Sequence, residues 1–196
     1  MKDFEDLGFH CGVDEVGRGA WAGPVVAAAV RFDKYHNIKG LADSKTLSPR
    51  KRVELYFEIL ETFPVGVSFS SARMIDQVNI LRSSLYAMQI AVEKVCKTKD
   101  SLYFDGNILP EAYKSGARSY SVIKGDGKIA SIAAASIVAK VSRDFYMKSL
   151  NIRYPGYGWE KNAGYGVEQH KAAIYRLGLN TEHRRSFKPI YNILCL

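Results

Sequence analysis

The chain has 196 residues, 47% hydrophobic and 24% charged, a balance that excludes intrinsically disordered and fibrous proteins. Its net charge of +8 favours polyanionic partners, and no apolar run approaches the roughly 20 residues that cross a bilayer, so no membrane partner is expected. The chain starts without a secretory signal pattern, and three widely spaced cysteines, Cys11, Cys96 and Cys195, predict free thiols in a cytoplasmic protein.

The first third of the chain predicts a β-hairpin, a helix and a further strand. His10–Val16 has the pattern of a buried strand, and a glycine-rich turn separates it from a second strand over Gly23–Phe32. Ser48 and Pro49 are a typical N-cap and first residue of a helix. The alternating residues of Val65–Phe69 predict another strand.

The rest of the chain alternates helices with short strands. Apolar residues at helical spacing predict a long helix over Leu81–Val95, and the apolar runs Leu102–Phe104 and Tyr120–Ile123 predict strands. An Ala-rich helix follows over Lys128–Leu150, and a last one over Val167–Arg176. This order predicts an α/β fold with a mixed β-sheet.

Four carboxylates stand in or directly after these apolar strands. Asp14 and Glu15 interrupt an apolar strand, where ionised side chains are costly, while Asp105 and Asp126 close two others. A buried salt bridge would explain the first pair, and Asp126 could simply cap the following helix. Successive strand residues point to opposite faces, so an ideal strand would not aim Asp14 and Glu15 at one point.

If the four carboxylates converge at one edge of the sheet, they repel one another and raise each other's pKa. Divalent cations with a preference for hard oxygen ligands, Mg²⁺ or Mn²⁺, are the simplest way to keep such a cluster ionised. The sequence therefore predicts a metal site at Asp14, Glu15, Asp105 and Asp126.

The turn Gly17-Arg18-Gly19 begins a stretch that fits the glycine pattern of dinucleotide-binding proteins, but the context excludes that interpretation. A dinucleotide site needs a helix to begin at the turn, whereas Gly23-Pro24 and a Val-rich strand follow here. Two glycines leave backbone groups open, so a phosphate or sugar could lie against the chain. A tight turn that merely needs glycine is the alternative.

Positive charge is concentrated in two segments. Residues 140–196 hold ten Lys or Arg and four Asp or Glu, and residues 31–52 hold seven and two. Aromatic residues are interleaved with the first of these segments, as suits a nucleic-acid surface, although charge runs are more often solvated faces.

The order and spacing of these motifs resemble the ribonuclease HII family, the type 2 ribonucleases H. The resemblance spans Gly12–Pro189 and rests on the segments GVDEVGRGAWAGPVV, LADSKTLSPRKR, MIDQVNILRSSLYAM, YFDGN, IKGDGKIASIAAASIVAKVSRD, GYGVEQH and HRRSFKP. Val167 after Gly-Tyr-Gly and the stretch Leu179-Asn180-Thr181 depart from the usual pattern, which leaves the local geometry of the tail open.

The resemblance implies an RNase H-like fold, with a five-stranded mixed sheet flanked by helices and a C-terminal helical extension. Residues 1–196 would form one domain, with a catalytic core over about 1–150 and a substrate-contacting extension over about 151–196. The implied activity is metal-dependent cleavage of RNA in RNA/DNA hybrids and at ribonucleotides embedded in duplex DNA, as in ribonucleotide excision repair, leaving 3′-hydroxyl and 5′-phosphate ends. Two divalent ions, Mg²⁺ or Mn²⁺, would activate water and stabilise the leaving oxygen. We expect a monomer.

The resemblance also implies roles for individual residues. Asp14, Glu15, Asp105 and Asp126 fall on the family's metal-binding acids. Gly17, Arg18 and Gly19 fall on the turn that reads the ribose 2′-hydroxyl, and Tyr165 on the tyrosine that stacks on the neighbouring deoxyribose.

Other basic residues have less specific expectations. Lys45 is a candidate phosphate contact, with a solvated surface charge as the equal alternative. His170, His183 and Arg143 are expected to be structural or weak phosphate contacts.

Two other functions compete with this hypothesis. A non-catalytic basic nucleic-acid-binding module would use the acids structurally, and another RNase H-like nuclease, such as a DNA resolvase, would share the metal chemistry. The Gly17-Arg18-Gly19 turn discriminates against the resolvase, because DNA has no 2′-hydroxyl to read.

Overall fold

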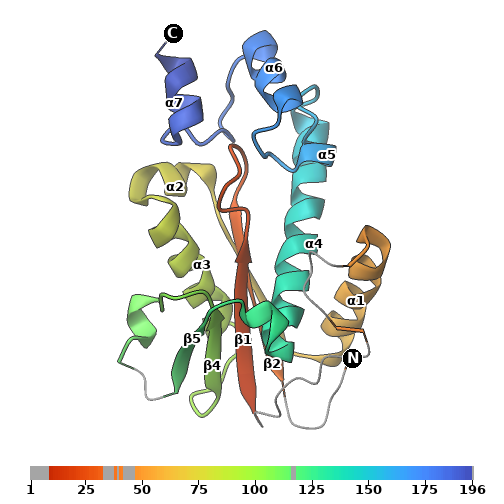
Figure 1. Cartoon of the computed structure of the whole chain (residues 1–196), viewed down its shortest axis with the longest axis vertical. Coiled ribbons are helices and arrows are strands. Elements are labelled where there is room, and N and C mark those ends of the chain that lie inside the picture. Colours follow the sequence, from red (N-terminus) through yellow and green to blue (C-terminus); the bar gives the residue numbers. More distant parts are fainter. Residues whose placement is uncertain (1–8, 33–37, 39, 42–46, 116–117, 196) are drawn as a thin grey trace.

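A five-stranded sheet in the order β3-β2-β1-β4-β5 runs through the centre of the computed structural model (Figure 1), which describes residues 9–32, 38, 40–41, 47–115 and 118–195. The strands are β1 (His10–Val16), β2 (Val25–Phe32), β3 (Val65–Ser70), β4 (Ser101–Asp105) and β5 (Ser119–Val122). Pairing is antiparallel between β1, β2 and β3, and parallel from β1 to β4 and from β4 to β5. The predicted mixed α/β sheet is confirmed.

The helices are α1 (Pro49–Thr62), α2 (Ala72–Val78), α3 (Ile80–Glu93), α4 (Ala130–Arg153), α5 (Trp159–Asn162), α6 (Glu168–Leu177) and α7 (Lys188–Leu194), with short 3₁₀ turns η1 (Glu111–Tyr113) and η2 (Gly125–Gly127). The predicted N-cap of α1 is confirmed, because the Ser48 hydroxyl accepts a hydrogen bond from the Lys51 N–H. The sequence did not resolve α2, α5 and α7 as separate helices. Across the described ranges, no helix combines the length and apolarity that a membrane span requires.

Two hydrophobic layers hold the sheet between helices. One layer joins Ala28 and Val30 of β2 to residues of α1 and α4, and the other joins Ala27 and Ala29 of the same strand to residues of α3. Adjacent residues of β2 therefore enter opposite layers, and the strand is buried on both faces, as its Val- and Ala-rich sequence indicates.

The helix α4 lies close against β1, and Gly12 makes this approach possible. A Cβ atom at Gly12 would lie 2.2 Å from the Ser131 carbonyl carbon and 2.3 Å from the Ile132 nitrogen. The missing side chain therefore sets the distance between α4 and the strand that carries Asp14, two residues further on. The fully buried alanines Ala133 to Ala135 have short side chains, which also lets α4 pack close to its neighbours.

The last three helices gather at one end of the molecule, beyond the end of the sheet where the β1–β2 turn lies (Figure 1). They share a third hydrophobic cluster with the C-terminal part of α4, centred on the fully buried Trp159. The turn is bonded to this end of the molecule, because Trp21 and Ala22 both donate backbone N–H groups to the Gly164 carbonyl, at 2.8 and 3.2 Å.

The prediction of free thiols is wrong for two of the three cysteines. Cys11 in β1 and Cys96, just beyond the end of α3, form a disulfide across 85 residues of sequence. Both cysteines border the hydrophobic layer between the sheet and α3, which brings them together. Sequence spacing gave no sign of this, because the contact depends on how α3 packs on the sheet. Cys195 is free and exposed.

Candidate active site

A cavity of about 470 Å³ opens near the end of β1 and contains three of the four predicted acids. Its lining consists of Asp14, Glu15, Val16, Arg52, Asp105, Ser136, Lys140 and Tyr165. Residues from β1, β4, α1, α4 and the segment before α6 therefore meet around one space. Acids, cations and an aromatic ring share it.

The ends of the strands explain why Asp14 and Glu15 reach the same cavity. The pairing of β1 with β4 ends at Val13 and Phe104, so both acids lie beyond the paired part of that side of the sheet. Their side chains leave opposite faces, but Glu15 has no neighbour on β4 to separate it from the cavity. The apparent conflict between strand geometry and a shared site is resolved by this overhang.

Asp14 is held in an environment that disfavours its charge. Its side chain is buried, and burial raises the pKa of Asp14 well above its ordinary value, with the charges of Glu15 and Asp105 raising it further. Two hydrogen bonds act in the opposite direction, one from the Glu15 N–H at 2.7 Å and one from the Ser136 hydroxyl. Burial and the neighbouring acids therefore outweigh these two hydrogen bonds, and the ionised form of Asp14 is disfavoured.

The charge of Glu15 is also disfavoured, but less strongly than that of Asp14. Burial raises the pKa of Glu15, while the guanidinium of Arg18 lowers it and the charge of Asp105 raises it again. The Arg18 Nη1 lies 3.3 Å from Glu15 Oε1, and the arginine side chain is half exposed. The second residue of the glycine turn thus partly neutralises one acid of the cavity.

The other two acids follow parallel strands, as predicted. Asp105 is the last residue of β4, and its Oδ1 accepts the Gly125 N–H at 2.7 Å. Asp126 is buried in η2, one residue further on, but it is not among the residues that line the cavity. The alternative that Asp126 caps α4 is wrong, because the N-cap is Ile129 and makes no side-chain cap bond.

The oxygen-rich lining fits a hard divalent cation. Three carboxylates face one cavity, and the raised pKa of Asp14 shows that a positive charge there would be favourable. In the part of the chain that is described, no three His, Cys, Asp or Glu side chains are grouped closely enough to form a complete metal site. The metal-binding role of the four acids therefore stays a prediction.

The Gly17-Arg18-Gly19 turn is held from behind by two buried arginines. Gly17 has φ +92°, and a Cβ there would lie 2.2 Å from Arg143 Nε, so only glycine fits. The Arg184 Nη1 donates to the Arg18 carbonyl at 2.9 Å. Nothing lies within 4 Å of where a Cβ of Gly19 would be, so that side of the turn is open.

Arg143 and Arg184 are fully buried and are paired with carbonyl oxygens. Arg143 donates to the carbonyls of Pro24, Ala22 and Ala163 at 2.9, 3.1 and 2.8 Å. Burial and the nearby Arg143 charge lower the pKa of Arg184 to about 9. The expectation that Arg143 is structural agrees with these bonds, which tie the turn to the segment before α6.

Tyr165 lies on that segment and lines the cavity. Its carbonyl accepts the His170 Nδ1–H at 3.0 Å, and the Arg143 guanidinium carbon lies 5.5 Å from the ring centroid. The proton assignment on His170 follows from Trp159, whose indole N–H can only donate and lies 3.0 Å from His170 Nε2. The carbonyl bond fixes the backbone of Tyr165, and the Arg143 guanidinium packs near its ring.

His170 and His183 are buried structural residues, as one of the two expectations had it. His183 Nδ1 lies 3.1 Å from both the Asn180 N–H nitrogen and Asn180 Oδ1, and its Nε2 lies 3.3 Å from His170 Nε2. Burial and the neighbouring His170 lower the pKa of His183 to about 4. Neither imidazole lines the cavity.

Sequence reasoning missed the three polar or charged lining residues beyond the predicted ones, and the structure does not test Lys45. Arg52, Ser136 and Lys140 were not singled out, although Ser136 and Lys140 are four residues apart on α4 and therefore share a helix face. Lys45, the candidate phosphate contact, lies outside the described residues.

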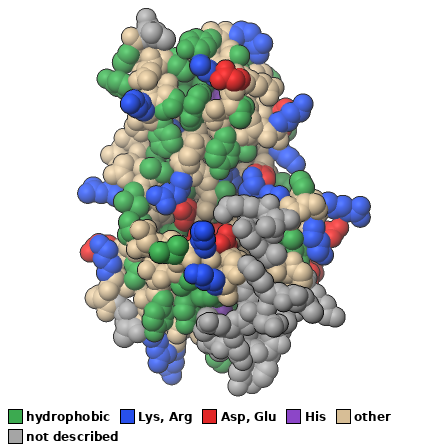
Figure 2. Space-filling view, viewed as in Figure 1, with side chains coloured by type: hydrophobic (Ala, Val, Ile, Leu, Met, Phe, Trp, Pro, Cys, Tyr) green, Lys and Arg blue, Asp and Glu red, His purple; other side chains and the backbone are tan. Residues whose placement is uncertain are grey.

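The basic side chains do not form one continuous patch on the face seen in Figure 2. Lys and Arg side chains are spread from the C-terminal helices to the sheet, with single acidic side chains between them. On this face, the distribution favours several separate contacts with a long polyanion over one strongly basic groove.

Comparison with known proteins identifies close relatives along most of the chain. The family model for ribonuclease HII matches residues 11–190. The ribonuclease HII of Ruegeria sp. strain TM1040 is 50% identical over 183 residues, which cover 93% of this chain and 79% of that protein.

Solved structures agree on the fold. The ribonuclease H2 of Pyrococcus horikoshii OT3 matches with TM-score 0.77 and 26% identity, covering 94% of this chain and 96% of that one. Bst-RNase HIII, solved in complex with Mn²⁺, matches with TM-score 0.78 and 21% identity, covering 96% of this chain and 70% of that one, and this similarity concerns the fold alone.

Proposed function

The chain belongs to the ribonuclease HII family, and from that membership we propose that it cuts the RNA strand of RNA/DNA hybrids and the 5′ side of single ribonucleotides in duplex DNA. The family makes the chain an endoribonuclease that hydrolyses phosphodiester bonds. The observation that carries the proposal is the shared cavity of Asp14, Glu15, Asp105 and Tyr165. Acids for catalysis and a ring for substrate stacking lie around one space.

The family depends on divalent metal, and Mg²⁺ or Mn²⁺ suits the oxygen donors present here. Asp14, Glu15 and Asp105 would hold the ions, with Asp126 as the fourth ligand. When bound, the ions supply an activated water and stabilisation of the leaving 3′-oxygen, which leaves 3′-hydroxyl and 5′-phosphate ends. A carboxylate whose pKa is raised by burial and by like charges gains most from such a cation, and Asp14 has that property.

The chain's own residues prepare this site. The Ser136 hydroxyl and the Glu15 N–H orient the Asp14 carboxylate, and the Gly125 N–H orients Asp105. Arg18 holds Glu15 through an exposed ion pair that an incoming phosphate can weaken. Preorientation by hydrogen bonds lowers the cost of assembling the ligands during each turnover.

The Gly17-Arg18-Gly19 turn and Tyr165 would supply the preference for ribonucleotides. The open side of the turn at Gly19 leaves backbone groups accessible to a ribose 2′-hydroxyl. Tyr165 would stack on the adjacent deoxyribose, held at a fixed distance from the turn by Arg143. The turn and Tyr165 would then contact the ribonucleotide and the neighbouring deoxyribonucleotide of one RNA–DNA junction.

We further propose one domain over residues 1–196, in which a C-terminal extension over about 151–196 contacts the substrate through Tyr165. A monomer in the cytoplasm is the proposed active form. Size-exclusion chromatography with light scattering tests this, and a dimer whose dissociation abolishes cleavage would contradict it.

The first experiment uses a labelled DNA duplex that contains one ribonucleotide. We expect cleavage on the 5′ side of the ribonucleotide with Mg²⁺, no cleavage with EDTA, and no cleavage of an all-DNA duplex. Binding without cleavage would favour a non-catalytic nucleic-acid-binding module. Cleavage of the all-DNA control would mean that the turn does not read a 2′-hydroxyl.

A further inference from the structure

Arg52 is a cation on the wall of the acidic cavity that local structure does not explain. It lies in the first turn of α1, where the helix dipole disfavours positive charge, and that turn contains no acidic residue. Its neighbours Arg50 and Lys51 both form ion pairs with Glu54, at 3.1 and 3.5 Å. Among the described residues Arg52 forms no ion pair.

The hydrogen bonds of Arg52 are also incomplete. Its Nη2 donates to the Leu47 carbonyl at 3.2 Å, which fixes the guanidinium plane. Its Nε–H is buried and has no hydrogen-bond partner within the described part of the chain. A buried donor without a partner costs about 1–3 kcal/mol, and an acceptor oxygen brought to this donor would recover part of that cost.

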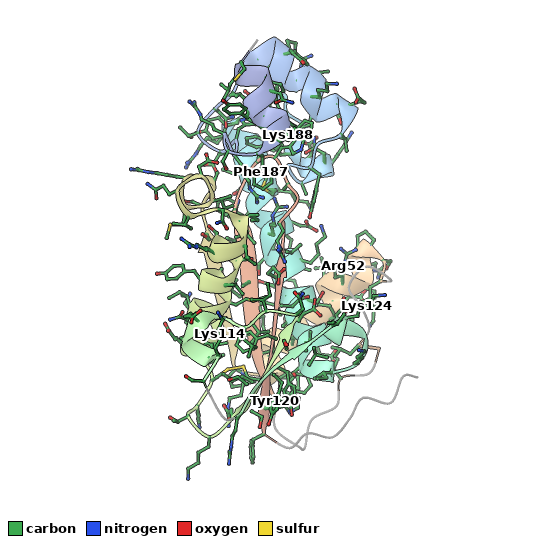
Figure 3. The ribbon with its side chains drawn as sticks, turned by 60° about the vertical axis from the view of Figure 1, so that its left-hand side comes forward. Arg52, Lys114, Tyr120, Lys124, Phe187 and Lys188 are labelled. Carbon is green, nitrogen blue, oxygen red and sulfur yellow. A yellow bond between two sulfur atoms is a disulfide. The ribbon has the colours of Figure 1, made fainter. Side chains whose placement is uncertain are left out.

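The acids that line the cavity with Arg52 are the predicted metal ligands Asp14, Glu15 and Asp105. An ion pair between Arg52 and one of them would compete with metal binding. The second cation on the wall, Lys140, is paired with Asp144 at 2.7 Å, one turn further along α4. Figure 3 shows Arg52 on the side of α1 that is turned toward α4. A phosphate entering the cavity would meet three acids and, in Arg52, an arginine that forms no ion pair with any described residue.

We infer that Arg52 binds a phosphate of the substrate strand inside the acidic cavity. The planar guanidinium matches the geometry of phosphate oxygens, and the bond to Leu47 preorganises it. The inference deepens the proposed function and rests on it: Arg52 fixes the position of the strand relative to Asp14, Glu15 and Asp105. It is a positioning residue that acts on the substrate backbone and has no part in the bond-breaking step.

The matched pair Arg52→Gln and Arg50→Gln tests this directly. Both variants remove one arginine charge from the first turn of α1, but the Arg50 side chain is 92% exposed and lies outside the cavity lining. We expect Arg52→Gln to raise KM about tenfold with a smaller change in kcat, and to reduce the salt dependence of binding by about one phosphate contact, a slope of ~0.9. Arg50→Gln is expected to change neither.

A scan with methylphosphonates separates phosphate binding from a structural role. Single neutral methylphosphonates replace each phosphate around the ribonucleotide, and binding is measured in EDTA so that no cleavage occurs. At one position we expect the wild-type protein to lose about tenfold in affinity and Arg52→Gln to lose no more than about twofold further. Arg52→Lys should recover part of the affinity for the unmodified duplex.

The outcomes distinguish the inference from the proposed function. If Arg52→Gln loses the same factor as wild type at every modified position, or behaves like Arg50→Gln, phosphate binding by Arg52 is wrong even though the enzyme cuts its substrate. Lower thermal stability without phosphate coupling would assign Arg52 to holding the Leu47 segment instead. If the wild-type protein binds but cuts nothing, the proposed function fails, while the methylphosphonate comparison still tests Arg52.

Discussion

Two groups of buried charges lie at neighbouring places in this molecule and are built in opposite ways. The acidic cavity holds Asp14 and Glu15 with their pKa values raised, and like charges adjoin them. The second group, Arg143 and Arg184, is fully buried, and five of its nitrogen atoms donate to carbonyl oxygens of the β1–β2 segment and of Ala163, while Arg184 Nη2 has no partner among the described residues.

This difference indicates that the two acids serve the reaction and that the two arginines stabilise the fold. The arginines have partners within the chain, so removing one leaves carbonyls unpaired and damages the fold. The acids have too few partners, so removing one relieves repulsion and damages only the reaction. Removing an acid should therefore raise stability and abolish activity, whereas removing an arginine should lower stability.

The largest expected effect is on activity in the acidic cavity. Asp14→Asn should lower kcat by at least about 10⁴-fold, about 5.4 kcal/mol of activation free energy, because an amide replaces a metal-binding carboxylate. Binding of an uncut hybrid in EDTA should change by less than about threefold. Glu58→Gln, an exposed acid on α1, is the control. An equal loss of binding would assign Asp14 a structural role.

The same variant should unfold at a higher temperature than wild type in EDTA at pH 7. The pKa of Asp14 is raised in the folded state, so ionisation lowers stability as pH rises from the unfolded-state pKa through the folded-state one. Asparagine removes that loss, and the difference should vanish in acid. Thermal unfolding at two pH values measures it, and a variant less stable at both would contradict the contrast between the two groups.

Removal of a structural charge should act in the other direction. Arg143→Met leaves the Pro24, Ala22 and Ala163 carbonyls without their donor, and we expect a loss of about 3–5 kcal/mol, or about 10 °C in Tm. Arg153→Met, the same change at an exposed position of α4, is the control for differential scanning fluorimetry. A decrease in Tm of less than about 2 °C would show that these three hydrogen bonds of Arg143 are not needed for stability.

The buried histidines extend the structural group and predict a pH dependence. His183 has its pKa lowered to about 4, so the unfolded chain takes up a proton first, and stability falls as pH drops from about 6.5 toward 4. The loss is on the order of 3 kcal/mol. Urea unfolding of Asp14→Asn measures it without the opposite contribution of Asp14. If NMR titration of the wild-type protein gave His183 a midpoint near pH 6.5, this predicted pH dependence would be refuted.

The smallest effect is expected where the two groups meet, at Tyr165. Tyr165→Ala should reduce the preference for a single ribonucleotide over a continuous hybrid about tenfold in kcat/KM, because one stacking contact is lost. Total affinity should fall less than this preference. Tyr175→Ala, an exposed tyrosine of α6, serves as the comparison. A uniform loss on all substrates would remove the stacking role.

Local patterns predicted most of the regular structure. The apolar stretch His10–Val16, the Ser48-Pro49 start of a helix and the Ala-rich stretch after Lys128 each became the expected element. These signals depend on residues a few positions apart, which is why the sequence carries them. The short helix α2 was missed; it is separated from α3 by a single residue, Asn79, with φ 73°.

The candidate site was predictable in its acids and less so in its basic residues. An acid inside an apolar strand is conspicuous in sequence, so Asp14, Glu15 and Asp105 could be singled out. A basic residue in a basic segment is not conspicuous, and Arg52 looked like its neighbours Arg50 and Lys51. Only the packing of α1 against α4 gave it a different environment.

The sequence by itself therefore determined the element order, the acids and the glycine turn, because each is written in neighbouring residues. The tertiary structure decided which side chains meet across long separations: Cys11 with Cys96, Arg143 with a carbonyl 119 residues away, and Arg52 with the acidic cavity. Such contacts are set by how helices pack on the sheet. Packing depends on the whole core at once, and no local pattern encodes it.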